Sequence, residues 1–210
     1  MTLKLQGSTS GHTAIEAPAS AGSNTLVLPP NNGTAGQLLQ TDGNGNLTWV
    51  DPPDSGIKNV DQWRLDADTT NGAELDPITN WTNTYTDDGV GRMGTSMGHS
   101  SGIFTFPSTG IWLIMGEFLF HVGTNDESMG QVFLDVSLDG SNYTPAHQIR
   151  CGSKDDDVHN SVGLSYTMDV TNTTNNKIKF RTESFSAQTN LRGSSGSGET
   201  TLIFIRLGDT

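Results

Sequence analysis

Apolar and polar residues alternate in several segments of the second half of the chain. Residues 132–138 alternate strictly and end at the turn sequence Asp139-Gly140-Ser141-Asn142, so we predict a strand with one face on a core and the other in solvent. Residues 164–170 and 177–181 repeat this pattern, and no segment after residue 57 has a helical period. The second half is therefore expected to be all-β. The apolar positions of the three strands are Val132, Leu134, Val136 and Leu138, then Leu164, Tyr166, Met168 and Val170, then Ile178 and Phe180.

Two further segments are apolar on both faces. Residues 111–122 carry large aromatic residues on one face, which would fill the gap between two sheets, and aliphatic residues on the other. Residues 202–207 are also apolar on both faces. No remaining segment of the chain offers a third layer, so we expect a neighbouring copy to cover the aliphatic faces. We assign Trp112, Ile114, Phe118 and Phe120 to the core of the subunit, and Leu113, Met115, Leu119, Ile203 and Ile205 to an interface between copies.

The first 56 residues contain short strand-like pieces joined by Gly, Ser, Asn and Pro. The sequence Asp42-Gly43-Asn44-Gly45 supplies the positive φ of a tight hairpin turn, and residues 51–56, with two prolines and a glycine, predict a linker. We therefore divide the chain into a β-rich attachment segment, residues 1–56, and a domain, residues 57–210. So few large apolar groups cannot form a core alone, and we expect the first segment to become ordered only in an assembly. The predicted pieces are Thr13 to Ala17, Thr25 to Leu28, Gln37 to Thr41 and Leu47 to Val50.

Composition narrows the functional classes. The chain has 210 residues, with 11 Lys and Arg against 23 Asp and Glu, and its net charge of −12 repels phosphate backbones, which argues against nucleic-acid binding. Only 32% of the residues are hydrophobic, which is low for one self-contained globular unit. The single cysteine, Cys151, is expected to be a small buried residue. The N-terminal residues become polar too early for a signal peptide, and the longest apolar stretch, residues 111–122, is too short for insertion into a membrane.

Catalytic motifs appear without the context that they require. Residues 94–98, Gly-Thr-Ser-Met-Gly, match a nucleophile elbow, but a turn and a strand are expected after the serine instead of a helix. Residues 89–94 match a dinucleotide-binding fingerprint, yet two aspartates precede it and no helix follows. The histidines lack the close spacing that favours a zinc site. We expect no enzyme and no cofactor. The histidines are His12, His99, His121, His147 and His159.

Two further binding features stay open. The run Asp155-Asp156-Asp157 supplies the carboxylate oxygens that calcium prefers, although three adjacent aspartates also suit a solvated turn. Several aromatic residues beside polar or turn residues could stack on sugars, with packing in a core or interface as the alternative. These aromatic residues are Trp63, Trp81, Tyr85 and Tyr143.

The segment Phe104 to Trp112 has the sequence Phe-Thr-Phe-Pro-Ser-Thr-Gly-Ile-Trp. It resembles the pattern Phe-x-x-Pro-x-x-Gly-x-aromatic of the C1q and tumour-necrosis-factor jelly rolls, where this segment enters a central strand. The order of the strands that follow, from the turn at Asp139-Gly140 to the closing strand at 201–207, is similar to the rest of that domain. The resemblance covers approximately residues 60–208. It implies a jelly-roll sandwich that forms homotrimers.

The first part of the chain resembles a second group of proteins. Residues 3–8, 25–29 and 36–49, the last with the sequence Gly-Gln-Leu-Leu-Gln-Thr-Asp-Gly-x-Gly-x-Leu-x-Trp, are similar to N-terminal segments of bacteriophage fibre proteins, especially marine ones. Residues 60–65 resemble the first knob strand of such proteins. This resemblance implies a homotrimeric virion protein. Its N-terminal segment would bind other virion proteins, and its jelly roll would form a knob.

The leading hypothesis is a phage virion structural protein, a head or tail fibre whose trimeric knob contacts a host-surface glycan or protein. A purely structural capsid decoration protein and a secreted C1q-like ligand or lectin are the alternatives. A polysaccharide-cleaving spike would need a pair of carboxylates that the sequence does not identify. We expect the knob to bind through loops at the end of the jelly roll away from the linker. The longest polar candidates are Ser153 to His159 and Gln188 to Glu199.

Overall fold

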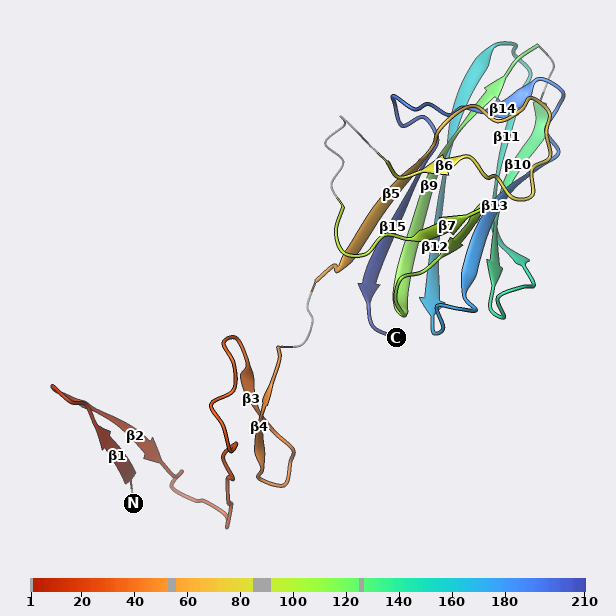
Figure 1. Ribbon diagram of the computed structural model, residues 1–210. Coiled ribbons are helices and arrows are strands. Elements are labelled where there is room, and N and C mark those ends of the chain that lie inside the picture. The colour runs from red at the N-terminus through yellow and green to blue at the C-terminus, as the bar shows by residue number, and fades with distance from the viewer. Residues whose placement is uncertain (1, 53–55, 85–91, 125–126) are drawn as a thin grey trace. The chain divides into compact units, whose positions relative to one another are not determined.

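The computed structural model describes residues 2–52, 56–84, 92–124 and 127–210. Every regular element in these ranges is a β-strand, and the strands of each sheet pair antiparallel (Figure 1). These ranges contain no helix that could span a membrane. The chain divides into two compact units, Met1–Asp54 and Ser55–Thr210, and the division falls within the predicted linker. The predicted all-β class is confirmed.

The first unit contains two separate hairpins. Strand β1 (Thr2–Gln6) pairs with β2 (His12–Glu16), and β3 (Leu38–Thr41) pairs with β4 (Leu47–Val50). Strand β1 was not predicted. The strand predicted at residues 25–28 is reduced to a single bridge, because only one of its residues finds a backbone partner.

The predicted turn between β3 and β4 is built by the side chain of Asp42. Its carboxylate accepts hydrogen bonds from the side-chain amide of Asn46, at 2.7 Å, and from the backbone N–H groups of Asn44 and Asn46, at 2.7 and 3.1 Å. These bonds, that from the Asn46 side chain most of all, lower the pKa of Asp42. The turn is therefore fixed by residues that are close together in the sequence.

The first unit has no buried core. None of residues 3–52 is buried, and β1 and β2 together place Leu3, Leu5 and Ile15 on one exposed face. A two-stranded hairpin with an uncovered apolar face is marginal in water. This face needs a cover that the unit itself does not supply.

The second unit is a sandwich of two sheets. The β9 sheet has the strand order β12-β9-β15-β5-β6, with β14 also pairing with β9, and the β10 sheet has the order β11-β10-β13-β8-β7. Antiparallel strands distributed in this way over two facing sheets form a jelly roll. The strands are β5 (Asn59–Leu65), β6 (Trp81–Thr82), β7 (Gly98–Ser100), β8 (Ile103–Thr105), β9 (Gly110–Val122), β10 (Glu127–Ser137), β11 (Thr144–Ser153), β12 (Val158–Val170), β13 (Lys177–Glu183), β14 (Thr189–Leu191) and β15 (Thr201–Gly208).

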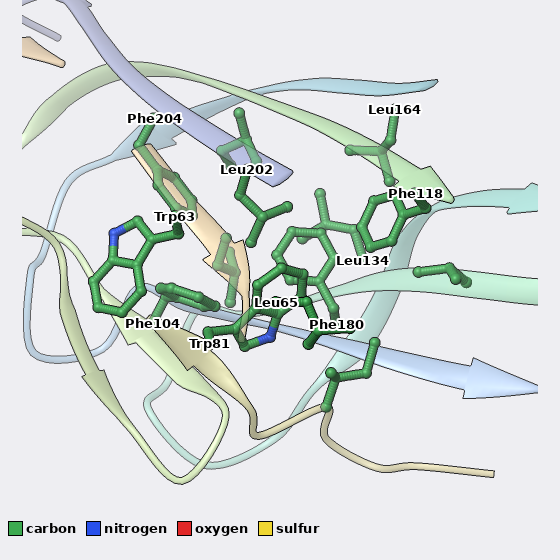
Figure 2. Close-up of a cluster of buried hydrophobic side chains, with 14 of the residues drawn as sticks. Trp63, Leu65, Trp81, Phe104, Phe118, Leu134, Leu164, Phe180, Leu202 and Phe204 are labelled. Carbon is green, nitrogen blue, oxygen red and sulfur yellow. The ribbon is translucent and has the colours of Figure 1, made fainter. Parts of the chain in front are cut away.

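Large aromatic side chains fill the space between the sheets (Figure 2). Phe118 of β9 packs against Phe180 of β13, with ring centroids 5.6 Å apart, and Trp81 packs against both rings. Truncating a buried ring of this kind to alanine costs about 3–5 kcal/mol. The predicted core face of β9 is confirmed, because all its large side chains are fully buried: Trp112, Ile114, Phe118 and Phe120.

Strand β10 departs from the prediction in two respects. It ends at Ser137, and Leu138 is 69% exposed instead of facing the core with the other apolar residues of the row. The opposite face, predicted to lie in solvent, is buried as well, since Phe133 lies under the Arg181 guanidinium and Asp135 pairs with the same group. Alternation along one strand cannot show that side chains of the next strand cover its polar face.

The strand directions define two ends of the sandwich. The chain enters β5 at Asn59, whose register partner Arg206 lies near the end of β15, and we call this the linker end. At the opposite end, the far end, β9 finishes at Val122, which lies between Val158 of β12 and Thr189 of β14. The loops of the sandwich are therefore divided between the linker end and the far end.

Candidate functional site

The aliphatic residues predicted to form an interface lie on the outside of the β9 sheet. Leu113 and Met115 of β9 are the register partners of Ile205 and Ile203 of β15. All four side chains are half-buried, while the residues that alternate with them face the core. Directly opposed side chains on one face of an antiparallel pair are in contact range. We call these four residues the aliphatic patch.

Small and polar residues flank the aliphatic patch. On one side Gly163, Ser165 and Thr167 of β12 pair with β9, and on the other side Val60 and Gln62 of β5 pair with β15. The short side chains of β12 leave room for another protein to approach the sheet. These flanking residues were not predicted, although small residues recur at every second position of β12, which is the signal that marks them.

A shallow hollow of about 360 Å³ lies over the aliphatic patch, between β9, β12 and β15. Met115 and Ile203 contribute apolar groups to its lining, and Glu117 contributes an exposed carboxylate. Beneath it, a Cβ on Gly116 would lie 2.7 Å from the Phe118 ring, so the glycine permits the core ring to sit under the hollow. The hollow suits an apolar side chain of a partner.

Leu119 is separated from the other predicted interface residues. Glu117 lies between it and Met115 on the outward face of β9, and the register partner of Glu117 on β15 is Thr201, the first residue of that strand. The Leu119 N–H donates to the Thr200 hydroxyl, at 3.1 Å. Leu119 is half-buried at the margin of the face, whereas the other four predicted residues adjoin.

The two loops predicted to carry recognition meet at the far end. The Asp157 N–H donates to the Gly123 carbonyl, at 2.7 Å, and the Gly123 N–H donates to the Gln188 carbonyl, at 3.0 Å. The turns at residues 154–157 and 184–188 are thus joined through the end of β9. Both lie away from the linker end, which the sequence alone could not determine.

Part of the second predicted loop is a buried strand. Residues 189–191, within the segment from Gln188 to Glu199, form β14 and are buried beside β9. Beyond it, Arg192 pairs with Asp68, and the Gly193 N–H donates to the same carboxylate, at 2.9 Å. The prediction of one long polar loop is therefore corrected, because backbone pairing and an ion pair hold its first part.

The register of β9 and β12 brings together two histidines that are distant in the sequence. His121 and His159 are register partners, and their rings stack with centroids 4.7 Å apart. His121 Nε2 lies 3.2 Å from Asp157 Oδ1, and Nδ1 lies 3.2 Å from Asn190 Oδ1. This polar cluster was not predicted, because spacing along the chain carries no information on cross-strand register.

The calcium candidate at residues 155–157 is the turn between β11 and β12. Asp155 is held through its backbone, whose N–H donates to the Ser153 hydroxyl, at 3.1 Å, and Asp157 lies beside His121. In the part of the chain that the structure describes, no three His, Cys, Asp or Glu side chains are grouped so that they could hold a metal ion. The arrangement is that of a solvated turn.

The aromatic residues considered for sugar stacking have different environments. Trp63 and Trp81 are only 5% and 6% exposed and belong to the core, so the sugar-stacking hypothesis is wrong for both. Tyr85 lies outside the described residues. Tyr143 is half-buried, and Lys179 Nζ lies 4.9 Å from its ring centroid. Burial raises the pKa of the Tyr143 phenol.

The predicted catalytic motifs do not form a catalytic site. Ser96 precedes strand β7 instead of a helix, and its hydroxyl accepts a hydrogen bond from Arg92, at 3.2 Å. Of the fingerprint at residues 89–94, only the last three residues are described. Cys151 is buried, as predicted, and burial raises the pKa of its thiol, which disfavours the reactive thiolate.

Comparison with solved structures identifies the fold. Eiger TNF from S. frugiperda matches with a TM-score of 0.52 and 11% identity, over 72% of this chain and 93% of that chain. Murine APRIL at pH 5.0 matches with a TM-score of 0.47 and 18% identity, over 71% of this chain and 98% of that chain. No protein-family model and no curated protein matches the chain. The likeness to Eiger shows a jelly roll of the tumour-necrosis-factor type, and at this identity it shows the fold alone.

Proposed function

We propose that this protein is a trimeric fibre subunit of a phage virion, with the second unit as a knob that contacts the host surface. The observation that carries the proposal is the aliphatic patch on the outside of the β9 sheet. In a monomer this patch would remain half-exposed to water, and contiguous exposed apolar surface is typical of an interaction site. Three copies around one axis would cover the three patches in a closed assembly.

A second copy of the chain is the partner that fits the aliphatic patch. In a ring of three, one surface of each subunit contacts a different surface of the next. Strands β11 and β12 are the edges of the two sheets, and Val162 and Tyr166 of β12 pack against the core there while remaining partly exposed. This open edge supplies an apolar counterpart for the patch of the neighbouring subunit.

The positions of the loops support the orientation of the knob. The chain arrives at the linker end, so an attachment segment that holds the virion leaves the far end free. The far end carries the turns at 154–157 and 184–188 and the polar cluster of His121 and His159. Loops on a packed scaffold vary without disturbing the core, which suits them to recognition. Host contact at the far end is part of the proposal.

The N-terminal sequence favours the virion over the secretory route. Residues 3–8, 25–29 and 36–49 resemble phage fibre segments, and the uncovered face of β1 and β2 needs a partner. A secreted ligand or lectin is the second candidate, and the fold likeness to Eiger favours it. The two candidates differ in where the protein occurs, which can be measured directly.

Three measurements on the full-length chain test the proposal. Light scattering gives the mass of the particle in solution, an antibody against the second unit locates the protein on intact virions, and incubation with host cells measures its retention. A trimeric mass, labelled fibres and retention on cells support the proposal. Label over the capsid without retention identifies a decoration protein instead. A monomeric mass or absence from virions overturns the proposal.

A further inference from the structure

The outer face of the β10 sheet carries a second surface, and the proposed trimer leaves it free. On this face Phe133 of β10 lies opposite Arg181 of β13 and Gln148 of β11, and Asp135 lies opposite Lys179. An aromatic ring, a carboxylate, two cations and an amide are therefore gathered on adjacent strands. None of them belongs to the aliphatic patch or to the far end.

A hollow of about 510 Å³ lies beside these residues, over β10 and β11. Phe133 and the half-buried Ala146 supply apolar groups to its lining, as does Pro145, and the exposed Gln148 supplies an amide. Strand β11 has an irregular register at this point, which leaves Ala146 as an extra residue between Pro145 and His147. A bulge of this kind bends the edge strand and is typical of functional surfaces.

A buried acceptor beside the hollow has no partner. Asp135 is 4% exposed, and its Oδ2 accepts a hydrogen bond from Arg181 Nε, at 2.9 Å. Its Oδ1 is buried and accepts no hydrogen bond from any described residue. Asp135 is the register partner of Pro145, which lines the hollow, and it points to the same side of the sheet as Phe133. An acceptor of this kind is satisfied by a donor from outside the protein, because leaving it unpaired costs about 1–3 kcal/mol.

The charges near the hollow select against an acidic ligand. Lys179 pairs with Asp76 and Asp135, and Arg181 pairs with Asp135 and Glu183. These two cations face three carboxylates, so the group carries 2 − 3 = −1, in a chain whose net charge is −12. An anionic ligand would be repelled, whereas a neutral ligand rich in hydroxyl groups would meet no net opposing charge.

We propose that the hollow over β10 and β11 binds a neutral saccharide. The apolar C–H face of a pyranose ring would lie on Phe133, Pro145 and Ala146, one ring hydroxyl would donate to Asp135 Oδ1, and another would pair with the Gln148 amide. The inference rests on the proposed function, in which the knob meets a host surface. It places one site on the flank of each subunit. Three shallow sites on one trimer bind a polysaccharide far more tightly than one site does.

The test uses the full-length trimer and two variants of the hollow. Gln148→Ala removes the exposed amide, and Ala146→Tyr fills the hollow with a ring. Thr144→Ala is the matched control, because Thr144 is exposed on the same strand and does not line the hollow. Light scattering and circular dichroism establish that each variant is folded and trimeric. The probes are neutral oligosaccharides of glucose, galactose and mannose and their uronic-acid counterparts, with binding measured by saturation-transfer NMR.

We expect a neutral oligosaccharide to bind the unmodified protein and the Thr144→Ala control equally. Gln148→Ala should weaken its binding about five- to tenfold, the effect of one lost hydrogen bond, and Ala146→Tyr should abolish it. Equal or stronger binding of the uronic acids, or binding that neither variant changes, overturns the proposal. Retention on host cells is measured separately. If the cells retain the protein but no neutral sugar binds, the saccharide site is wrong and the proposed function stands; if sugars bind but cells and virions lack the protein, the reverse holds.

Discussion

On the outer face of the β10 sheet, the Arg181 guanidinium lies 3.8 Å from the centroid of the Phe133 ring and pairs with Asp135. On the outer face of the β9 sheet, Leu113 has Thr167 and Ile205 as its neighbours across the strands. Long charged side chains cover the first face, whereas nothing in the subunit covers the second. A sandwich can thus complete one outer face by itself and leave the other to a partner.

The cause of this difference is visible in single strands. Strand β13 carries Lys177, Lys179 and Arg181 on its outward positions, and such side chains can lay their stems over a neighbouring apolar ring while the charge reaches an acceptor. Strand β12 carries Ser165 and Thr167 on its outward positions, and they are too short to reach across. The outward residues of the neighbouring strand therefore decide whether an apolar outer face is covered within the subunit.

The largest effect is expected from a charge placed on the uncovered face. Leu113→Asp would bury three like charges near one axis in the proposed trimer, at a cost of several kcal/mol per ion, and the particle should dissociate to monomers. The monomer should remain folded, because Leu113 is outside the core. Light scattering gives the mass, and Gln148→Asp on the β10 sheet is the control that should stay trimeric. A Leu113→Asp protein with unchanged mass would contradict the proposed interface.

A smaller effect is expected from removing the cover of the other face. Arg181→Ala leaves Asp135 with Lys179 as its remaining cation, 3.9 Å away, and uncovers the Phe133 ring. Loss of one partner of a buried ion pair costs about 3–5 kcal/mol, so the urea midpoint should fall clearly. The measurement needs one fixed protein concentration, because the stability of an oligomer depends on it. Arg150→Ala, an exposed residue of β11, should change the midpoint little, and equal loss in both variants would refute the distinction.

Acid should act on the core before it acts on either face. The His99 ring packs on Trp63 and Phe104, at 5.2 and 4.7 Å between centroids, and burial lowers the pKa of His99 from its ordinary value of 6.5. Below pH 6.5 the unfolded chain therefore binds this proton more readily than the folded chain, so stability falls as the pH decreases. Thermal midpoints between pH 7.5 and 5 measure the effect, as conditions chosen around the ordinary histidine pKa of about 6.5.

The contribution of His99 is isolated by substitution. His99→Gln should flatten the dependence of the thermal midpoint on pH, while His147→Gln, at an exposed position, should leave it unchanged. The trimeric mass should be constant over this range before unfolding begins. Dissociation of folded subunits on acidification would instead place the sensitive group on the aliphatic face of the β9 sheet.

The smallest effect is expected from separating the two units. A protein of residues 57–210 should keep its trimeric mass, and its thermal midpoint should change by no more than about 2 °C, because both compared faces lie within it. A peptide of residues 1–56 should be unfolded by circular dichroism, because none of residues 3–52 is buried. A folded monomeric peptide would show that β1 and β2 need no partner, and a monomeric 57–210 protein would move the interface to the first unit.

Features set by neighbouring residues were predictable from the sequence. The core face of β9 follows from period-2 alternation, which the direction of successive side chains imposes. The turns at Asp42 and Asp139 follow from a carboxylate that accepts nearby backbone N–H groups, at 2.7 Å to Asn44 and 2.7 Å to Asn142. Four of the five predicted interface residues also adjoin, because they alternate with that core face in two paired strands.

Features set by cross-strand register were not predictable from one sequence. The stacking of His121 on His159 depends on how β9 and β12 align, and the burial of Phe133 depends on which residue of β13 lies beside it. The exposure of Leu138 has a local cause that alternation hides, since β10 stops one residue earlier. Pattern identifies which way a side chain points, and only pairing identifies what it meets.

The pairing of Asn59 with Arg206 has a consequence for engineering. Because the polypeptide enters and leaves the sandwich at the same end, a short peptide could join residue 210 to residue 57, and the chain could be opened in the turn at 154–157. Such a circular permutant would keep every strand register while moving both termini to the opposite end. A shaft attached to these new termini would hold the jelly roll upside down, so that the linker end became its outermost surface.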